Sequence, residues 1–70
     1  MRFDIYGRFE IEIDMTDHGW TAYRQSNGLR TPYRELIIPG YLEEADIEQF
    51  LVDHFHEYAQ PGQIIRRLPD

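Results

Sequence analysis

Hydrophobic and polar residues alternate over residues 2–15 of the chain. The apolar positions are Phe3, Ile5, Phe9, Ile11, Ile13 and Met15. The polar positions are Arg2, Asp4, Tyr6, Arg8, Glu10, Glu12 and Asp14. A period of two predicts a β-strand with one face on the core and the other in water. Gly7 falls on the apolar side, where it predicts a bulge, a bend, or the close approach of a side chain such as Trp20.

A turn and a second strand are expected next. Residues 16–19, Thr-Asp-His-Gly, suit a tight hairpin because glycine adopts left-handed conformations easily. The second strand then runs over residues 20–25, and two registers are open. One places Trp20 and Ala22 in the core beside Met15 and Ile13, whereas the other places Thr21 and Tyr23 there. We favour the first, because it buries the largest apolar side chain.

The third strand is expected after residues 26–28, Ser-Asn-Gly. Asn-Gly is the strongest two-residue signal for a hairpin turn. Pro32 cannot donate a ladder hydrogen bond, so the strand is predicted to begin late and at a sheet edge. Its firm part is predicted from Tyr33 to Ile38, and Pro39-Gly40 ends it.

Residues 43–59 have the spacing of an amphipathic helix. The apolar stripe recurs every three or four residues and consists of Ile47, Phe50, Leu51, His54, Phe55 and Tyr58. Acidic residues occupy the first turn, where the helix dipole favours negative charge. Pro61-Gly62 terminates the helix, and a short final strand follows from Gln63 to Leu68.

The predicted order of elements is β-β-β-α-β. We therefore expect an α+β fold with a small, mostly antiparallel sheet and one helix packed on one face. Residues 1–70 form a single domain, because a chain of 70 residues has room for only one.

The composition narrows the compartment and the partners. There is no cysteine, which fits a reducing cytosol, and no apolar run approaches the roughly 20 residues of a membrane helix. The first residues lack the apolar core of a secretion signal, so we expect a cytoplasmic protein without membrane contact. A net charge of −6 argues against duplex nucleic acid as the partner.

The charges are segregated along the chain. Arg24, Arg30 and Arg34 lie in a stretch without acids, and residues 43–57 carry acids without a basic residue. All seven basic residues are arginine, which suits bidentate pairing with carboxylates or phosphates. The simplest expectation is that these arginines pair with the protein's own acids.

Two histidines near the end of the predicted helix are the candidates for chemistry. His54 falls on the apolar stripe with Tyr58, whereas His56 falls on the opposite, wet face. The two imidazoles therefore diverge and cannot share a metal within one chain. Asp53 and Glu57 could join His56, but a zinc site needs three or four ligands on a shaped support. We expect His54, Tyr58 and Trp20 to be structural or pocket-lining residues, and we expect no metal.

Catalysis and cofactor binding have little support in the pattern. Ser26, the only serine, lies in a turn without a neighbouring base, and the glycines are scattered rather than gathered in a phosphate-binding loop. A domain this small has little material for both a pocket and the residues that support it. We therefore expect no enzyme, no catalytic residue and no cofactor.

Arginine and tyrosine residues around the predicted hairpin are the candidate binding surface. Its members are Tyr23, Arg24, Arg30, Tyr33 and Arg34, with Tyr6 nearby. These residue types are enriched at the hot spots of protein interfaces, and they also form platforms for single-stranded nucleic acid.

Most of the chain also resembles a known family. The stretch RELIIPGYLEEADIEQFLVDHFHEYAQPGQIIRRL, together with the opening MRFDIYGR, is similar to a family of short bacterial proteins of unknown function. The resemblance implies no activity. The order of elements also resembles, in architecture alone, the antitoxins of HicB type, which favours a protein-binding module by analogy.

The expected function is binding to protein, including self-association through an open edge of the third or the final strand. The alternative is a module that associates with nucleic acid through Tyr23, Arg24, Arg30 and Arg34. A small metal-binding protein is the third possibility.

Overall fold

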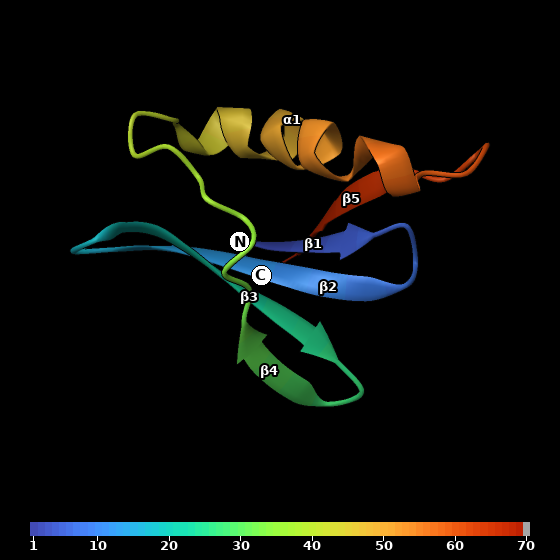
Figure 1. Ribbon diagram of the computed structural model, residues 1–70, viewed down its shortest axis with the longest axis horizontal. Coiled ribbons are helices and arrows are strands. Elements are labelled where there is room, and N and C mark those ends of the chain that lie inside the picture. The colour runs from blue at the N-terminus through green and yellow to red at the C-terminus, as the bar shows by residue number, and fades with distance from the viewer. Residues whose placement is uncertain (70) are drawn as a thin grey trace.

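The fold is a five-stranded antiparallel sheet covered on one face by a single helix (Figure 1). A computed structural model describes residues 1–69. The elements are β1 Arg2–Ile5, β2 Phe9–Thr16, β3 Gly19–Ser26, β4 Leu29–Pro32, α1 Glu44–Phe55, the 3₁₀ helix η1 His56–Tyr58, and β5 Ile65–Leu68. The strands lie in the order β4-β3-β2-β1-β5. The predicted α+β class, with an antiparallel sheet, one helix and a strand after the helix, is confirmed.

The long first strand of the prediction is a hairpin. Residues 6–8 form a turn between β1 and β2, closed by a hydrogen bond of 3.0 Å from the Arg8 N–H to the Ile5 carbonyl. Tyr6 and Gly7 both have positive φ, at 56° and 72°. Ile5 pairs with Phe9 across this turn, so both side chains face the core. The predicted bulge or bend at Gly7 is therefore a complete reversal of the chain.

The register of β2 and β3 is the one favoured by the burial of tryptophan. Met15 pairs with Trp20, and Ile13 pairs with Ala22. The Trp20 indole N–H also donates a hydrogen bond of 3.0 Å to the Leu42 carbonyl, which fixes the ring under the segment that leads to α1. Met15 itself is largely exposed, because it lies beyond the end of the helix-covered part of the sheet.

The third predicted strand begins earlier than expected, and its predicted firm part is wrong. Asn27 and Gly28 form a two-residue turn with φ of 53° and 81°, and β4 starts directly after it at Leu29. β4 ends at Pro32, after which the Tyr33 N–H donates the last bond to the Ala22 carbonyl, at 2.9 Å.

Residues 33–38 leave the sheet and rise toward the helix. Leu36 and Ile38 are buried while Ile37 is 81% exposed, so the alternation in this segment is real. It arises because alternate side chains of a connecting segment reach the space between sheet and helix. No ladder of hydrogen bonds accompanies it, because the pairing with β3 stops at the bond from the Tyr33 N–H to the Ala22 carbonyl.

The helix matches the prediction closely. α1 covers Glu44–Phe55, and its last turn tightens into η1. An Asp46 carboxylate oxygen accepts a hydrogen bond of 3.4 Å from the Glu43 N–H, which helps to satisfy the free amides at the helix start. None of the helices in residues 1–69 has the length and apolar character needed to cross a membrane.

The core lies between the helix and the middle of the sheet. Its buried residues are Phe3, Ile5, Ile11, Ile13, Leu36, Ile38, Ile47, Leu51, Phe55 and Ile65. They come from β1, β2, β5, α1 and the segment after β4, whereas β3 and β4 contribute no fully buried side chain. The hairpin of β3 and β4 extends beyond the region that the helix covers (Figure 1).

Candidate functional site

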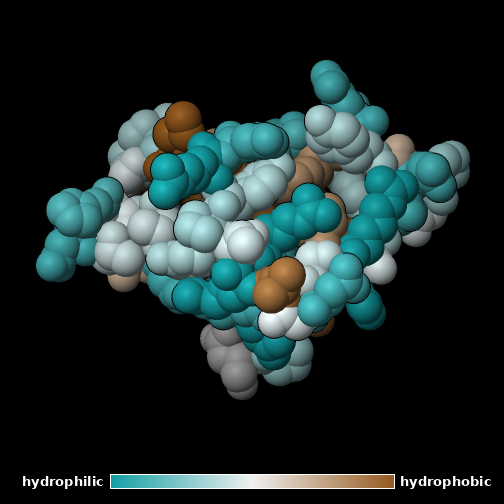
Figure 2. Space-filling view, turned by 60° about the horizontal axis from the view of Figure 1, so that its bottom comes forward, coloured by the Kyte–Doolittle hydropathy of each residue, from teal (hydrophilic) through white to brown (hydrophobic). Residues whose placement is uncertain are grey.

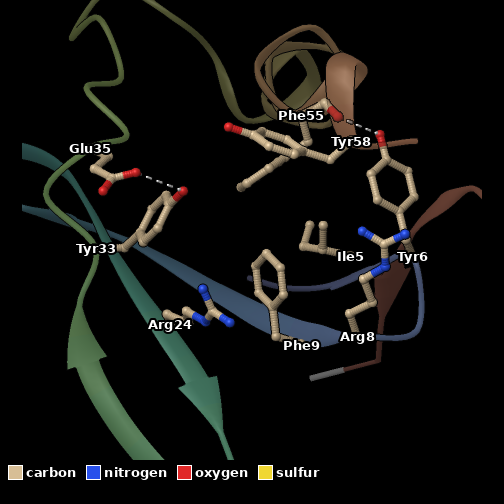
Figure 3. A pocket seen from close by; sticks show the side chains of 9 residues that line it. All are labelled: Ile5, Tyr6, Arg8, Phe9, Arg24, Tyr33, Glu35, Phe55 and Tyr58. Atoms are coloured by element: carbon tan, nitrogen blue, oxygen red, sulfur yellow. Dashed lines mark hydrogen bonds between the residues drawn. The ribbon is translucent and has the colours of Figure 1, made fainter. Parts of the chain in front are cut away.

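A pocket of about 290 Å³ opens beside the end of α1, on the face of the sheet that the helix covers. Figure 3 shows the side chains around it. They come from β1, the β1–β2 turn, β2, β3, the segment after β4, the end of α1, and η1. The lining residues are Ile5, Tyr6, Arg8, Phe9, Arg24, Tyr33, Glu35, Phe55 and Tyr58. We refer to this feature as the aromatic pocket.

Aromatic rings build the walls of the pocket. Phe9 and Phe55 meet edge to face with ring centres 5.7 Å apart, and Tyr33 stacks on Phe55 at 6.1 Å. Phe55 is buried, so its ring ties the helix end to the sheet, while Phe9 and Tyr33 are only half-buried. Such pairs hold each other in place, and they leave flat apolar surface facing the opening.

Two arginines border the same opening. Arg24 pairs with Ile11 across β2 and β3, which directs its side chain to the helix-covered face. Its guanidinium lies 4.1 Å from the centre of the Phe9 ring. Arg8 comes from the β1–β2 turn and donates a hydrogen bond of 3.3 Å to the Gln63 side-chain oxygen. The two cations flank Phe9 in Figure 3.

Neither of these arginines forms an ion pair with an acid among residues 1–69. Four other arginines do, as expected from the sequence, whereas Arg34, like Arg8 and Arg24, has no such pair within residues 1–69. Those four pairs are Arg2 with Glu10, Arg30 with Glu12, Arg66 with Asp4, and Arg67 with Glu44. The aromatic pocket thus brings together two arginines that have no ion-pair partner among residues 1–69.

Tyrosine hydroxyls supply the remaining polar groups. The Tyr6 hydroxyl donates a hydrogen bond of 3.2 Å to the Phe55 carbonyl, and the Tyr33 hydroxyl donates one of 3.5 Å to the Glu35 carboxylate. Burial raises the pKa of Tyr33, and the nearby negative charge of Glu35 raises it further, while Arg24 opposes the change. Tyr33 therefore stays a neutral hydrogen-bond donor across the physiological pH range.

The predicted binding residues are divided between the two faces of the sheet. Arg24 and Tyr33 line the aromatic pocket. Tyr23 and Arg30 lie on the opposite face, where the Arg30 guanidinium is 3.8 Å from the Tyr23 ring centre and also pairs with Glu12. Arg34 is exposed and borders a shallower hollow on the other side of Tyr33. Tyr23 and Tyr33 also border that hollow, whereas Arg24 and Arg30 do not.

The residues expected to be structural or pocket-lining take different positions. Tyr58 is 61% exposed and forms part of the rim of the aromatic pocket. Trp20 is half-buried and borders two shallow hollows elsewhere on the molecule. His54 is half-buried at the margin of the helix stripe, with its ring edge-on to those of Tyr33 and Phe55.

His54 does not lie at the centre of the buried stripe, and this position decides whether its ring needs a hydrogen-bond partner. The centre of the buried stripe runs through Ile47, Leu51 and Phe55, so His54 lies to one side of it. In the part of the chain that the structure describes, no buried side-chain nitrogen or oxygen lacks a partner. His54 is half-buried and forms no side-chain hydrogen bond within residues 1–69, so it is not one of the buried polar groups that need a protein partner.

Arg8, Phe9, Glu35 and Phe55 belong to the pocket but were not among the predicted site residues. The sequence pattern marks Phe9 and Phe55 only as core positions. It gives no indication that Glu35 lines a site. Arg8 lies in a stretch read as one continuous strand, which places it on the wrong side of the sheet. The turn at residues 6–8 is the feature that brings it to the pocket.

Metal ligands do not gather anywhere in residues 1–69: no three histidine or acidic side chains lie close enough to hold an ion. Asp53, which could have joined His56, accepts a hydrogen bond of 2.9 Å from the Gln49 side chain instead.

Figure 2 shows another face of the molecule, on which hydrophobic residues are scattered among hydrophilic ones.

The fold and the pocket together describe a small α+β domain with one aromatic, arginine-bordered cavity. By sequence, the chain belongs to a family described as a domain of unknown function (DUF7661), whose model matches residues 1–68. The resemblance to a family of unknown function is thereby confirmed. No curated protein and no solved structure matches the chain. The architectural likeness to HicB-type antitoxins stays a prediction.

Proposed function

We propose that this domain is a protein-binding module and that the aromatic pocket receives one side chain of the partner. The observation that carries the proposal is the joint position of Arg8 and Arg24, unpaired within residues 1–69, beside the half-exposed rings of Phe9 and Tyr33. Arginine and tyrosine dominate interface hot spots because each combines a large apolar area with directed hydrogen bonds.

The size of the pocket favours a single side chain. Sites for small molecules usually measure about 300–1,000 Å³, and this pocket lies at the lower end, at about 290 Å³. It is also open on one side, so that a bound group can remain attached to a larger body. A protein segment that inserts one residue suits both properties.

The alternatives have weaker support. For nucleic acid, Tyr23 and Arg30 face away from Arg24 and Tyr33, and Arg30 is already paired with Glu12. The net charge of −6 also opposes a phosphate backbone. Self-association through β4 or β5 uses edges that are open within the described residues, yet each is four residues long and carries arginine, and β4 ends in proline. These features discourage strand pairing.

The test is a selection of peptides from a random displayed library on the immobilised domain. We expect the selected peptides to shift the amide resonances of pocket residues. Tyr58→Ala, which removes an exposed ring from the rim, should weaken their binding about tenfold, as loss of a hot-spot side chain does. Tyr41→Ala is the matched control, because Tyr41 is 84% exposed and lies outside the pocket.

The result that would overturn the proposal is equally definite. If no selected peptide discriminates between the wild-type domain and Tyr58→Ala, the pocket is not the binding site. If the peptides shift resonances of β4 or β5 and the domain becomes dimeric with concentration, the strand-edge form of the proposal replaces it.

A further inference from the structure

We propose that the group recognised in the aromatic pocket is a carboxylate of an acidic side chain that has an aromatic residue as its neighbour in the partner segment. This inference rests on the proposed protein-binding function and names the chemistry of the bound group. Three observations support it: the charge balance of the chain, the positions of the two guanidinium groups, and the hydrogen bond that the carbonyl at the end of α1 accepts.

The charge balance is the first support. The chain has 13 acidic residues and only seven arginines, so acids to pair with are in excess. Arg2, Arg30, Arg66 and Arg67 have such partners, whereas Arg8, Arg24 and Arg34 have none among residues 1–69. Of these three, Arg8 and Arg24 lie at one opening. In an acidic protein, two cations without ion-pair partners at one opening favour a local potential opposite to that of the surrounding surface. An anion from outside is the complementary group.

The placement of the guanidinium groups is the second support. Arg24 lies with its guanidinium 4.1 Å from the Phe9 ring centre, so its position is restricted before any ligand binds. Arg8 is held by its hydrogen bond to the Gln63 side chain. Both border the same opening in Figure 3. A guanidinium held in place presents its N–H groups as a fork that matches a carboxylate.

The helix end is the third support. The last carbonyls of a helix carry partial negative charge and would repel an anion. Here the Phe55 carbonyl accepts the hydrogen bond of the Tyr6 hydroxyl, which covers it on the side of the pocket. Glu35, the only acid that lines the pocket, is engaged by Tyr33. The carboxylate is therefore directed to Arg8 and Arg24 and away from Glu35.

The aromatic neighbour follows from the walls. The rings of Tyr33 and Tyr58 leave apolar surface beside the two cations. A ring attached next to the acid can stack there in an offset or edge-to-face arrangement. An acidic side chain without such a neighbour would leave this surface in contact with water.

The experiment compares two capped hexapeptides that differ in charge alone. One contains a glutamate next to a phenylalanine, and the other has glutamine in place of the glutamate. Binding to the full chain is followed by amide chemical shifts at low salt. We expect the glutamate peptide to bind about fivefold more tightly, and we expect this preference to shrink as salt screens the charges.

Variants locate the preference. The double substitution Arg8→Gln and Arg24→Gln should remove the preference for glutamate, so that the double variant binds the two peptides with equal affinity. Arg66→Gln is the control, because Arg66 lies on the opposite face of the sheet beside Asp4. Thermal melting of each variant confirms that it is folded, and the single substitution Arg8→Gln serves if the double variant is not.

The outcomes separate this inference from the proposed function. Equal binding of the two peptides, or a preference that survives the double substitution, overturns the carboxylate inference. So does the absence of binding by both peptides when library-selected peptides still bind the pocket, and in that case the protein-binding function stands. If the library also yields no pocket-dependent peptide, both proposals fail. Strong binding of free benzoate without a peptide preference would assign the pocket to small aromatic acids instead.

Discussion

The Tyr6 hydroxyl donates a hydrogen bond of 3.2 Å to the main-chain carbonyl of Phe55, joining the first turn of the chain to the last turn of the helix. The two residues are 49 positions apart in sequence. Tyr6 is thus a positioning residue for the aromatic pocket, because it fixes the distance between the turn that carries Arg8 and the helix end that carries Phe55 and Tyr58.

Tyr6→Phe should therefore lower the free energy of unfolding by about 1 kcal/mol, the usual net value of one hydrogen bond. Urea denaturation measures the change. Tyr41→Phe, at a residue with no hydrogen bond from its hydroxyl within residues 1–69, should leave the midpoint unchanged. Equal effects of the two substitutions would show that the bond to Phe55 contributes nothing.

Leu51 is fully buried in the middle of the helix. Its side chain is buried between Ile47 and Phe55 on the face that contacts the sheet. Leu51→Ala should destabilise the domain by about 2–5 kcal/mol, because the lost apolar contacts are accompanied by a cavity. Circular dichroism during chemical denaturation reports this loss. Leu29→Ala is the matched control at a residue that is 70% exposed, where the change should stay within about 0.5 kcal/mol.

Gly28 adopts a left-handed conformation that a side chain would strain. It is the second residue of the Asn27-Gly28 turn, with φ of 81°. Gly28→Ala should cost about 1–2 kcal/mol, because Cβ disfavours this region of the backbone. Gly40→Ala tests the same change at a glycine without positive φ and should be close to neutral. Thermal melts of both variants decide the matter, and a smaller loss for Gly28→Ala than for Gly40→Ala would contradict the assignment.

Tyr33 gives the domain a dependence on alkaline pH. Its folded-state pKa lies above the ordinary value of about 10, because burial and then Glu35 disfavour the phenolate. A raised pKa means that the associated stability is complete below about pH 10 and is lost as the pH rises through the folded value. Above about pH 10, the unfolding free energy of the wild type should therefore fall relative to that of Tyr33→Phe.

The measurement is urea denaturation of both proteins from pH 8 to pH 11. Absorbance titration of the phenolates provides a second readout, in which Tyr33→Phe should remove a component whose pKa lies above the ordinary tyrosine value. A difference between the two proteins that does not change with pH would show that Tyr33 ionises as it does in the unfolded chain.

Most elements could be predicted where the signal is local. The helix is defined by the spacing of Ile47, Leu51 and Phe55 and by the proline that follows it. The Asn27-Gly28 turn is visible because its glycine tolerates positive φ, and a two-residue turn reverses the phase of the alternation. The strand pairing of β2 and β3 followed from burying Trp20, since a slip of one residue would turn it outward.

The first hairpin was missed for a definite reason. Three residues separate Ile5 from Phe9, so the two paired side chains keep the phase that they would have in one continuous strand. Alternation alone cannot distinguish the two arrangements. Missing this turn also misplaced one residue of the candidate site. A continuous strand places Arg8 on the polar face with Glu10 and Glu12, whereas the turn brings it to the aromatic pocket.

The composition of the pocket could be predicted only in part. Arg24 has the same phase as Ala22, so the favoured register already directs it to the helix-covered face. Its contact with Phe9 and the approach of Tyr33 depend on the path of residues 33–38, which was predicted to be a strand. The pocket joins four stretches that are distant in sequence, and no local pattern encodes their meeting.

The absence of β3 and β4 from the buried core has a further consequence for how the domain opens. Their hairpin is attached by backbone pairing and half-buried side chains, so its amides should exchange with solvent before those of β1 and β2. The aromatic pocket takes Arg24 from this less stable unit and Phe55 from the core. A ligand held by both would couple two parts of unequal local stability, and slower amide exchange in β3 and β4 would then record its binding.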